Sequence, residues 1–371
     1  MSALQLEREL ERDRVDLARV ESRLRDVALR ISSTNTVRLP FDAIRGSITR
    51  SLSGGKRIRP LLLLHTYRRL EEQRDGSRDT DSSSPETASG VIDIAAAFEL
   101  LHAAFVAHDD VIDGDLKRRG DLNAVGEAVS LAVDHGVPPK AAARLGVTAG
   151  ILSGDLLLGA AYSLVARAAV PTEVRSSLLD LVDRTLLDSA EGEYADVWFS
   201  IAPSHADPER VVVTSELKTA RYSFQAPLLA AATLATSEPA VRDALDEIGA
   251  ALGTVYQLRD DVLGVFGNPE TTGKSALGDL REGKHTLLVE LARSTDAWRG
   301  ASDRFGKPDL DEVDAERLRG ALRDSGALAQ VESEIQRRVD SAARRIDEAP
   351  LPQELQTYLA HLLIRCAERT S

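Results

Sequence analysis

The sequence predicts an all-helical protein, and three observations support this. Hydrophobic residues make up 43% of the chain and aromatic residues only 4%. Most of the apolar residues are Ala, Leu and Val, and Ala and Leu lead the scale of helix propensity. The alternation typical of strands is nearly absent, because the one strand-like run, Val211 to Val213, has helical flanks.

Charge and cysteine content exclude several classes of partner. The chain carries 46 basic and 59 acidic residues, a formal net charge of −13. Such a chain is repelled by nucleic acid and by anionic membrane surfaces, so we expect no nucleic-acid partner. Cys366 is the single cysteine and allows no intrachain disulfide, which favours a reducing compartment. We therefore expect a cytoplasmic protein.

No segment resembles a targeting signal or a membrane span. The first twenty residues are charged throughout and lack the apolar run of about 7 to 15 residues of a signal peptide. The most apolar stretches, 156–170 and 227–235, fall short of the roughly 18 uncharged residues of a span. We expect no integral membrane span.

Apolar periodicity places the helices in order. The first is amphipathic, with apolar residues mostly three and four apart, and packs on the body of the protein or on a partner subunit: Leu6, Leu10, Leu17, Val20, Leu24, Val27 and Ile31. A second helix is expected over 56–70, followed over 71–90 by a polar segment that is either a surface loop or disordered. A long helix from about Pro85 to Asp113 follows.

Prolines open several of the later helices. We expect helices over 138–170, 171–200, 209–235, 239–266, 283–294, 313–325, 327–348 and 352–368, with a turn over 203–208. The polar segments are short relative to the helices that they join. We therefore expect an N-terminal helical extension over 1–37 and one catalytic domain over 38–371.

The first chemical signal is a group of four aspartates, Asp109, Asp110, Asp113 and Asp115. On a helix, Asp109 and Asp113 lie about 40° apart on one face. Like charges at that spacing destabilise a helix, so a cation is expected there, and Mg²⁺ suits carboxylates supplemented by water and phosphate oxygens. A solvated acidic helix end is the alternative, and a calcium loop fits poorly because residues 117–119 are basic.

The second signal is the sequence Gln257-Leu-Arg-Asp260-Asp261 on a later helix. Gln257 lies one turn before Asp261, so the polar side chains can face one way. Two acidic clusters on separate helices would be able to clamp one polyanion through metal ions. A purely solvated surface cluster is again the alternative.

Basic residues supply the third signal. They are Lys56, Arg57 and Arg59 after a glycine pair, Arg118 and Arg119 after the first acidic cluster, and Lys218, beside Thr219, and Lys274 further on. Each alone fits a solvated surface charge, but their alternation with acidic clusters indicates two diphosphate sites. His102 lies seven residues before Asp109 on the same helix face. It is a phosphate donor or an ordinary half-buried histidine.

Six motifs in this order resemble the trans-isoprenyl diphosphate synthase (polyprenyl synthetase) family, and within it a geranylgeranyl diphosphate synthase. They are GGKRIRP, ELLH, HDDVIDGDLKRRG, KTA, YQLRDD and TGK, and the resemblance runs from about Arg38 onward. It implies one large antiparallel helical bundle around a central cavity, a homodimer, and Mg²⁺ as cofactor. Isopentenyl diphosphate and an allylic diphosphate are the implied substrates.

The resemblance also implies a role for each matching position. The metal ligands would be Asp109, Asp110, Asp113, Asp260 and Asp261, with Asp109, Asp113, Lys218 and Asp260 as the catalytic set. The allylic diphosphate would be bound by Arg118, Lys218, Thr219, Gln257 and Lys274. Isopentenyl diphosphate would be bound by Gly55, Lys56, Arg59, His102 and Arg119.

Two positions depart from the family pattern. Gly264 stands where the second aspartate-rich motif usually has its third aspartate, so one metal site would lose an outer ligand. Tyr256 replaces the usual Phe before the glutamine. Because the first two aspartates, Gln257 and Lys274 are present, we expect activity to survive.

The implied reaction ionises the allylic diphosphate, joins the isopentenyl double bond to the allyl cation, and releases a proton, with the freed diphosphate as its acceptor. Apolar helices would exclude water from the cation. A class I terpene cyclase is a rival hypothesis, although such enzymes lack the second aspartate pair and the GGKxxRP motif. A non-catalytic partner subunit of a synthase is another, supported only by Gly264.

Product length depends on how far the growing tail can extend. Phe105 lies one turn, roughly 5 to 6 Å, before Asp109 on about the same face and is the nearest bulky side chain. It would form the floor of the tail cavity, or it is an ordinary core residue. Ala104 is small and turned away. We expect a medium-length product, C20 geranylgeranyl diphosphate, with C15 or C25 and longer as alternatives.

Overall fold

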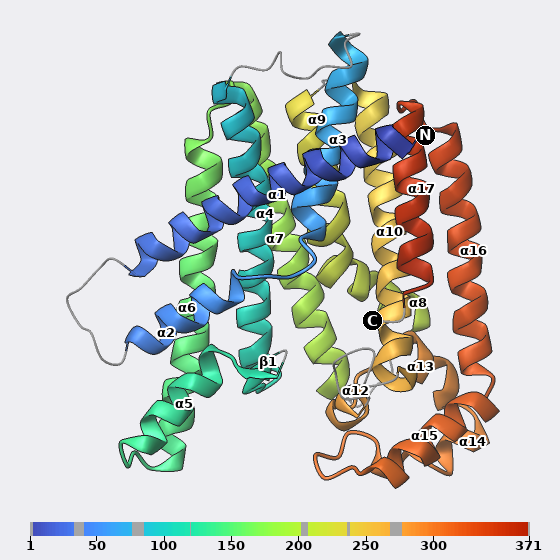
Figure 1. Cartoon of the computed structure of the whole chain (residues 1–371). Helices are drawn as coiled ribbons and strands as arrows, with labels where there is room; N and C mark the ends of the chain where they lie inside the picture. Colours follow the sequence, from blue (N-terminus) through green and yellow to red (C-terminus); the bar gives the residue numbers. More distant parts are fainter. Residues whose placement is uncertain are drawn as a thin grey trace. The chain divides into compact units, whose positions relative to one another are not determined.

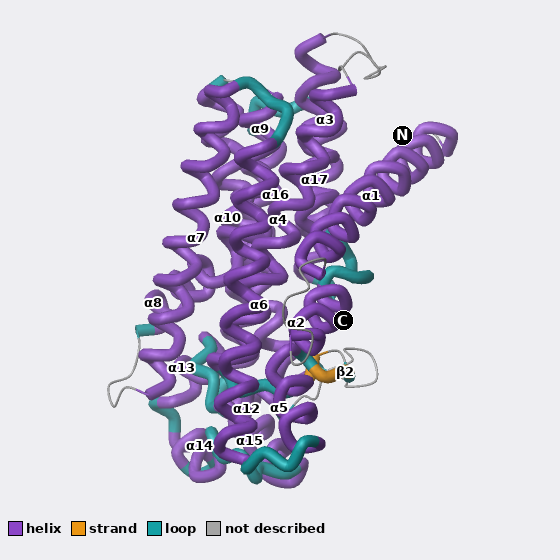
Figure 2. Tube along the Cα trace, turned by 90° about the vertical axis from the view of Figure 1, so that its left-hand side faces the viewer, coloured by secondary structure: helices purple, strands orange, loops and turns teal. Residues whose placement is uncertain are grey.

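The computed structural model of this chain is built almost entirely of helices in its described residues, with one small hairpin (Figures 1 and 2). It describes residues 3–32, 41–75, 85–118, 120–201, 207–235, 238–267 and 277–369. In these ranges the all-helical prediction is confirmed. The exception is the hairpin of β1 (Lys117–Arg118) and β2 (Asp121–Leu122), in which Lys117 pairs with Leu122 and Arg118 with Asp121.

The elements divide into an earlier and a later set along the chain. The first set is α1 (Ala3–Ser32), α2 (Phe41–Ser51), α3 (Ile58–Asp75), α4 (Pro85–Ile112), α5 (Ala124–Asp134), α6 (Pro139–Arg167) and α7 (Thr172–Ile201). The second set is α8 (Pro208–Ser215), η2 (Glu216–Gln225), α9 (Ala226–Ala235), α10 (Pro239–Phe266), α12 (Gly278–Glu282), α13 (Leu287–Arg293), α14 (Asp296–Arg299), η3 (Ser302–Arg304), α15 (Glu312–Asp324), α16 (Ala327–Glu348) and α17 (Gln353–Ala367).

The chain forms two compact units. One comprises Met1–Val182 with Ala230–Thr236, and the other comprises Asp183–Leu229 with Ser237–Ser371. Helix α7 therefore begins in the first unit and ends in the second. The predicted boundary at residue 37 stays a prediction.

Helix α4 is the central helix of the first unit. It packs against α1, α3 and α6. Its residues 90–101 are all buried and, apart from Asp93 and Glu99, apolar, as expected of an enclosed stretch of helix. The residues that carry this core on α4 are all at most 1% exposed: Ile94, Ala95, Ala96, Ala97, Phe98, Leu100 and Leu101. This packing fixes the axis of the helix whose end carries the first aspartate group.

Glycines let α6 approach α4 and α5 closely. A Cβ on Gly150 would lie 2.2 Å from Val111 on α4, and one on Gly154 would lie 2.1 Å from His108. One turn earlier, Gly146 meets Val129 of α5 in the same way. The spacing of four residues puts all three on one face of α6, so the acidic end of α4 is held against a rigid neighbour.

The amphipathic face of α1 packs on its own chain. Val20, Leu24 and Val27 are at most 1% exposed, and α1 contacts α2, α3 and α4. The sequence left open whether this helix packs on the body of the protein or on a partner subunit, and in the structure it packs on the body of the protein.

In the second unit, α10 is the central helix and packs against η2, α16 and α17. The sequence predicts a regular helix over 209–235, but residues 216–225 form a π-helix between α8 and α9. Here η2 lies very close to α10, since a Cβ on Gly253 would be 2.2 Å from Ala220. Apolar periodicity does not distinguish a π-helical segment from the α-helix around it, which is why this prediction was wrong in detail.

Other boundaries also differ from the prediction. The predicted helix over 283–294 starts later, because Gly283 has a left-handed φ of 69° and ends α12, while Thr286 caps α13. Both ends of the segment 71–90 are helical rather than irregular, since α3 continues to Asp75 and α4 begins at Pro85. Helices α2 and α5 were not predicted. The predicted turn over 203–208 lies largely outside the described residues.

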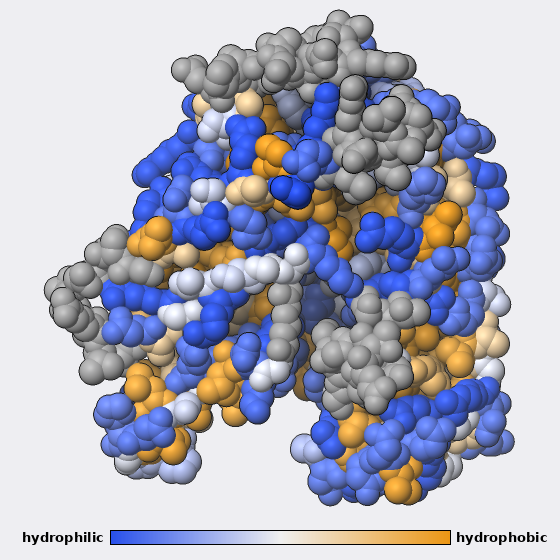
Figure 3. Space-filling view, viewed as in Figure 1, coloured by the Kyte–Doolittle hydropathy of each residue, from blue (hydrophilic) through white to orange (hydrophobic). Residues whose placement is uncertain are grey.

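From the sequence, every apolar stretch was expected to be too short for a membrane span, and by length and composition this is not so. Within the described ranges, two helical segments, Ala88–Ile112 and Pro139–Arg167, are long and apolar enough to cross a membrane by length and composition alone. The apolar window is 78% buried in the first and 44% buried in the second. On the face drawn in Figure 3, hydrophobic patches lie among hydrophilic ones.

Candidate functional site

The first acidic cluster lies at the end of α4. Asp110 is buried, Asp109 is half-buried and Asp113 is exposed. The guanidinium of Arg118 donates to Asp110 over 2.6 Å and to Asp109 over 3.4 Å. Burial raises the pKa of Asp110 to about 6, although the charge of Arg118 and its hydrogen bond act in the opposite direction. Arg118 therefore neutralises part of the negative charge of Asp109 and Asp110, whereas Asp113 is exposed.

The hairpin holds Arg118 in this place. Asn123 donates from its side chain to the carbonyl of Asp115 over 2.8 Å and accepts from the backbone of Gly126, so it closes the hairpin and caps α5 together. A Cβ on Gly126 would lie 2.1 Å from the carbonyl oxygen of Leu116. The basic segment after the aspartates is thus folded back on them by local contacts.

The second acidic cluster lies near the end of α10. Gln257 donates to Asp261 over 2.8 Å, which confirms that these two side chains share one face. Asp260 pairs with Arg369 over 2.9 Å, and the Arg369 guanidinium stacks on the ring of Tyr256. Burial raises the pKa of Asp261 to about 8; the Gln257 hydrogen bond opposes this shift, and nearby carboxylates add to it.

Gly264 is one turn beyond Asp260 on α10, at the position of the missing third aspartate. A Cβ on Gly264 would lie 1.8 Å from Oδ2 of Asp279, so the Asp279 carboxylate fills the space that a side chain would need. Asp279 pairs with Lys284 over 3.2 Å and contributes to the raised pKa of Asp261. The second cluster therefore has a further carboxylate from α12, which sequence spacing did not reveal.

The glycine-rich turn before α3 carries the first basic group. Gly54 and Gly55 have positive φ angles of 68° and 104°, which favour glycine. Lys56 is exposed and Arg59 is half-buried at the start of α3. His102 is half-buried on α4, in the same unit.

Lys218 and Thr219 lie half-buried on the π-helix η2. Lys218 donates to Asp196 over 2.7 Å and to Glu193 over 3.2 Å, and both acceptors lie on α7. A Cβ on Gly192 of α7 would lie 2.3 Å from the backbone nitrogen of Lys218, so the two helices touch at this point. π-helical turns often occur at functional sites.

Two predicted site residues, Arg119 and Lys274, lie outside the described residues. Phe105 on α4 is half-buried, whereas Ala104 is fully buried.

The donor set fits Mg²⁺ rather than a metal enclosed by protein ligands alone. Within the described ranges, no three Asp, Glu, His or Cys side chains form a ready metal-binding group. Mg²⁺ is usually held by one or two carboxylates, with water and substrate phosphates completing the octahedron. Raised pKa values at Asp110 and Asp261 mark places where a bound cation would favour the ionised carboxylate.

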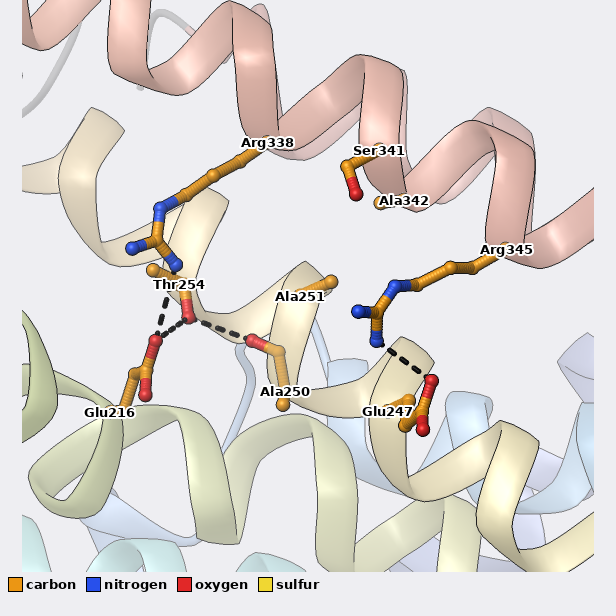
Figure 4. Close-up of a pocket in the computed structure, with 9 residues that line it drawn as sticks. All are labelled: Glu216, Glu247, Ala250, Ala251, Thr254, Arg338, Ser341, Ala342 and Arg345. Atoms are coloured by element: carbon orange, nitrogen blue, oxygen red, sulfur yellow. Dashed lines mark hydrogen bonds and ion pairs between the residues drawn. The ribbon is translucent and has the colours of Figure 1, made fainter.

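A separate cavity of about 190 Å³ lies beside α10, α16 and η2 (Figure 4). Arg338 pairs with Glu216, and Arg345 pairs with Glu247. The arginines that line this cavity are therefore already paired with glutamates, and none of the predicted site residues lines the cavity. Because its positive charges are balanced by carboxylates, this cavity does not resemble a diphosphate-binding site.

Comparisons with known proteins agree with the motifs. Residues 42–312 match the model of the polyprenyl synthetase family. The geranylfarnesyl diphosphate synthase of Aeropyrum pernix is 29% identical over 319 residues, covering 84% of this chain and 89% of that protein. The octaprenyl diphosphate synthase of Haemophilus influenzae is 33% identical over 297 residues, covering 78% of each.

Solved structures show the same relationship. The crystal structure of geranylgeranyl pyrophosphate synthase from Corynebacterium glutamicum, complexed with isoprenyl diphosphate and magnesium, is 28% identical to this chain with a TM-score of 0.82. The match covers 94% of this chain and 98% of that one. Every predicted site residue falls within the range matched by the family model.

Proposed function

Because this chain belongs to the polyprenyl synthetase family, we propose that it condenses isopentenyl diphosphate with an allylic diphosphate to a C20 product, geranylgeranyl diphosphate. The chain is a trans-prenyl diphosphate synthase by its family and its relatives. The observation that carries the proposal is the pair of acidic clusters at the family's motif positions, each with a carboxylate of raised pKa.

We assign Asp109, Asp113 and Asp260 to hold Mg²⁺, with Asp110 and Asp261 beside them. The bound cations would stabilise negative charge on the departing diphosphate. Arg118 forms an ion pair with Asp110, and Lys218 forms one with Asp196. When substrate is bound, both cationic side chains would bind diphosphate oxygens.

The rest of the reaction needs few polar groups. Lys56, Arg59 and His102 would orient isopentenyl diphosphate so that its double bond attacks the allyl cation. The Ala- and Leu-rich helices would exclude water that would quench this cation. The proton lost in the last step would pass to the released diphosphate.

We propose Phe105 as the floor of the tail cavity. Its half-buried state, next to the fully buried Ala104, supports a side chain that borders a space rather than one enclosed in the core. Relatives named for geranylgeranyl diphosphate support a C20 product, and relatives named for geranylfarnesyl and octaprenyl products keep longer products as alternatives.

We also propose a homodimer in the cytoplasm. Three apolar residues on α6, Val147, Ile151 and Leu152, are 42 to 43% exposed. Light scattering of the purified protein should give twice the chain mass of 40.1 kDa, and Ile151→Asp should shift it to the monomer. A wild-type monomer would contradict the dimer.

Product chromatography tests the function. The purified chain alone is incubated with isopentenyl diphosphate, Mg²⁺ and each of the C5, C10 and C15 allylic diphosphates. Longer diphosphates with C20 dominant are expected. Cyclised hydrocarbons would indicate a terpene cyclase, and no turnover without another subunit would indicate a non-catalytic partner.

A further inference from the structure

Arg57 is a buried arginine in an unfavourable backbone conformation. It follows Lys56 and precedes the first residue of α3, and its side chain is 5% exposed. Its φ of 47° is left-handed, and it is the one non-glycine residue with a positive φ in the described part of the chain. This conformation costs a residue with a side chain about 1 to 2 kcal/mol, so contacts of the side chain must hold it there.

These contacts come from three separate segments. The Arg57 guanidinium donates to Glu21 of α1 over 2.6 Å and to Glu99 of α4 over 2.8 Å. It also donates to the carbonyl of Leu52, which closes the glycine-rich turn onto the end of α2. The planar guanidinium satisfies all three acceptors at once, which a lysine ammonium on a flexible stem does less well.

The residues around Arg57 are those assigned above to isopentenyl diphosphate. Lys56 and Arg59 flank it in sequence, and His102 lies one turn after Glu99 on α4. Residues three apart on a helix share a face, so the anchor at Glu99 and the imidazole of His102 are neighbours. The Arg57 side chain therefore fixes the basic turn relative to the helix that carries His102.

Resting on the proposed function, we propose that Arg57 is a positioning residue for the isopentenyl diphosphate subsite, and that α1 acts on this subsite through Glu21. Helix α1 lies before the residues matched by the family model. Glu21 is 29% exposed, whereas Glu99 is 8% exposed, so the anchor from α1 lies nearer to solvent and is the easier one to change without disturbing the core.

A second ion pair between α1 and α4 provides a control for the test. Asp93 of α4 accepts from Arg23 of α1 over 2.5 and 3.1 Å, so this pair also joins α1 to α4 but does not touch the glycine-rich turn. Glu21→Gln and Asp93→Asn each remove one charge from an α1 ion pair. Steady-state kinetics with each substrate varied in turn, and thermal unfolding, are measured on both variants and on Arg57→Lys.

We expect Glu21→Gln and Arg57→Lys to raise KM for isopentenyl diphosphate about tenfold, because the basic turn that binds this substrate is held less firmly in place. KM for the allylic diphosphate and kcat should stay within about twofold. Asp93→Asn should lower the unfolding temperature as Glu21→Gln does, yet leave both KM values unchanged.

The inference is overturned if an active wild type and both Glu21→Gln and Arg57→Lys share one KM for isopentenyl diphosphate. It is also overturned if Asp93→Asn raises that KM equally, since α1 would then act only through overall stability. A wild-type chain without turnover would instead refute the proposed function, and this inference with it. Arg57→Lys keeps the test valid if Glu21→Gln does not fold.

Discussion

Replacing Gly264 by alanine should separate stability from activity. The new Cβ would lie 1.8 Å from Oδ2 of Asp279, so the carboxylate must move by more than an ångström. That movement weakens its 3.2 Å contact with Lys284. Both side chains are partly exposed, so this pair contributes at most about 1 kcal/mol.

The stability terms nearly cancel. Gly264 lies inside α10, and Ala is favoured over Gly in a helix interior by about 1 kcal/mol. We therefore expect Gly264→Ala to change the free energy of unfolding by less than about 1 kcal/mol.

The metal affinity should respond more strongly than the stability. Displacing the Asp279 carboxylate from beside Asp261 weakens the attraction for a cation, since charges a few ångströms apart near a surface interact by several kcal/mol.

We expect Gly264→Ala to raise the Mg²⁺ concentration for half-maximal activity about tenfold, equivalent to 1.4 kcal/mol. The assay is an Mg²⁺ titration of turnover, together with Mn²⁺ binding followed by electron paramagnetic resonance. Gly320→Ala is the matched control, because Gly320 lies inside α15 and a Cβ there meets nothing within 4 Å. If the two variants have the same metal dependence, Asp279 has no part in the second cluster.

The remaining predictions concern the metal, the two substrates and the product. Asp109→Ala and Asp260→Ala should each lower kcat more than about a hundredfold, and full activity in excess chelator would contradict a metal requirement. In assays varying one substrate at a time, Lys56→Ala should raise KM mainly for isopentenyl diphosphate and Lys274→Ala mainly for the allylic one; equal effects would refute the assignment. Phe105→Ala should lengthen the product in chromatography, whereas an unchanged distribution from a folded variant would exclude the floor.

The helical class and most of the helices could be predicted from the amino-acid sequence, because the spacing of apolar residues within a helix is a local property of the chain. The sequence also determined the acidic and basic motifs, since their residue types and spacing are written in short stretches. The shared face of Gln257 and Asp261 followed from their spacing of one helical turn, and the structure adds a hydrogen bond between them. Family membership followed from the order of these motifs.

Which groups from distant parts of the chain come into contact could be seen only in the folded structure. Asp279 lies fifteen residues after Gly264 along the chain, and only the packing of α12 on α10 brings its carboxylate to the space of the missing aspartate. In the sequence, Arg57 was one of several basic residues in a motif. In the folded chain it is buried and donates to Glu21 and Glu99, which are 36 and 42 residues away. Contacts of this kind depend on how helices pack, and local periodicity carries no information about that packing.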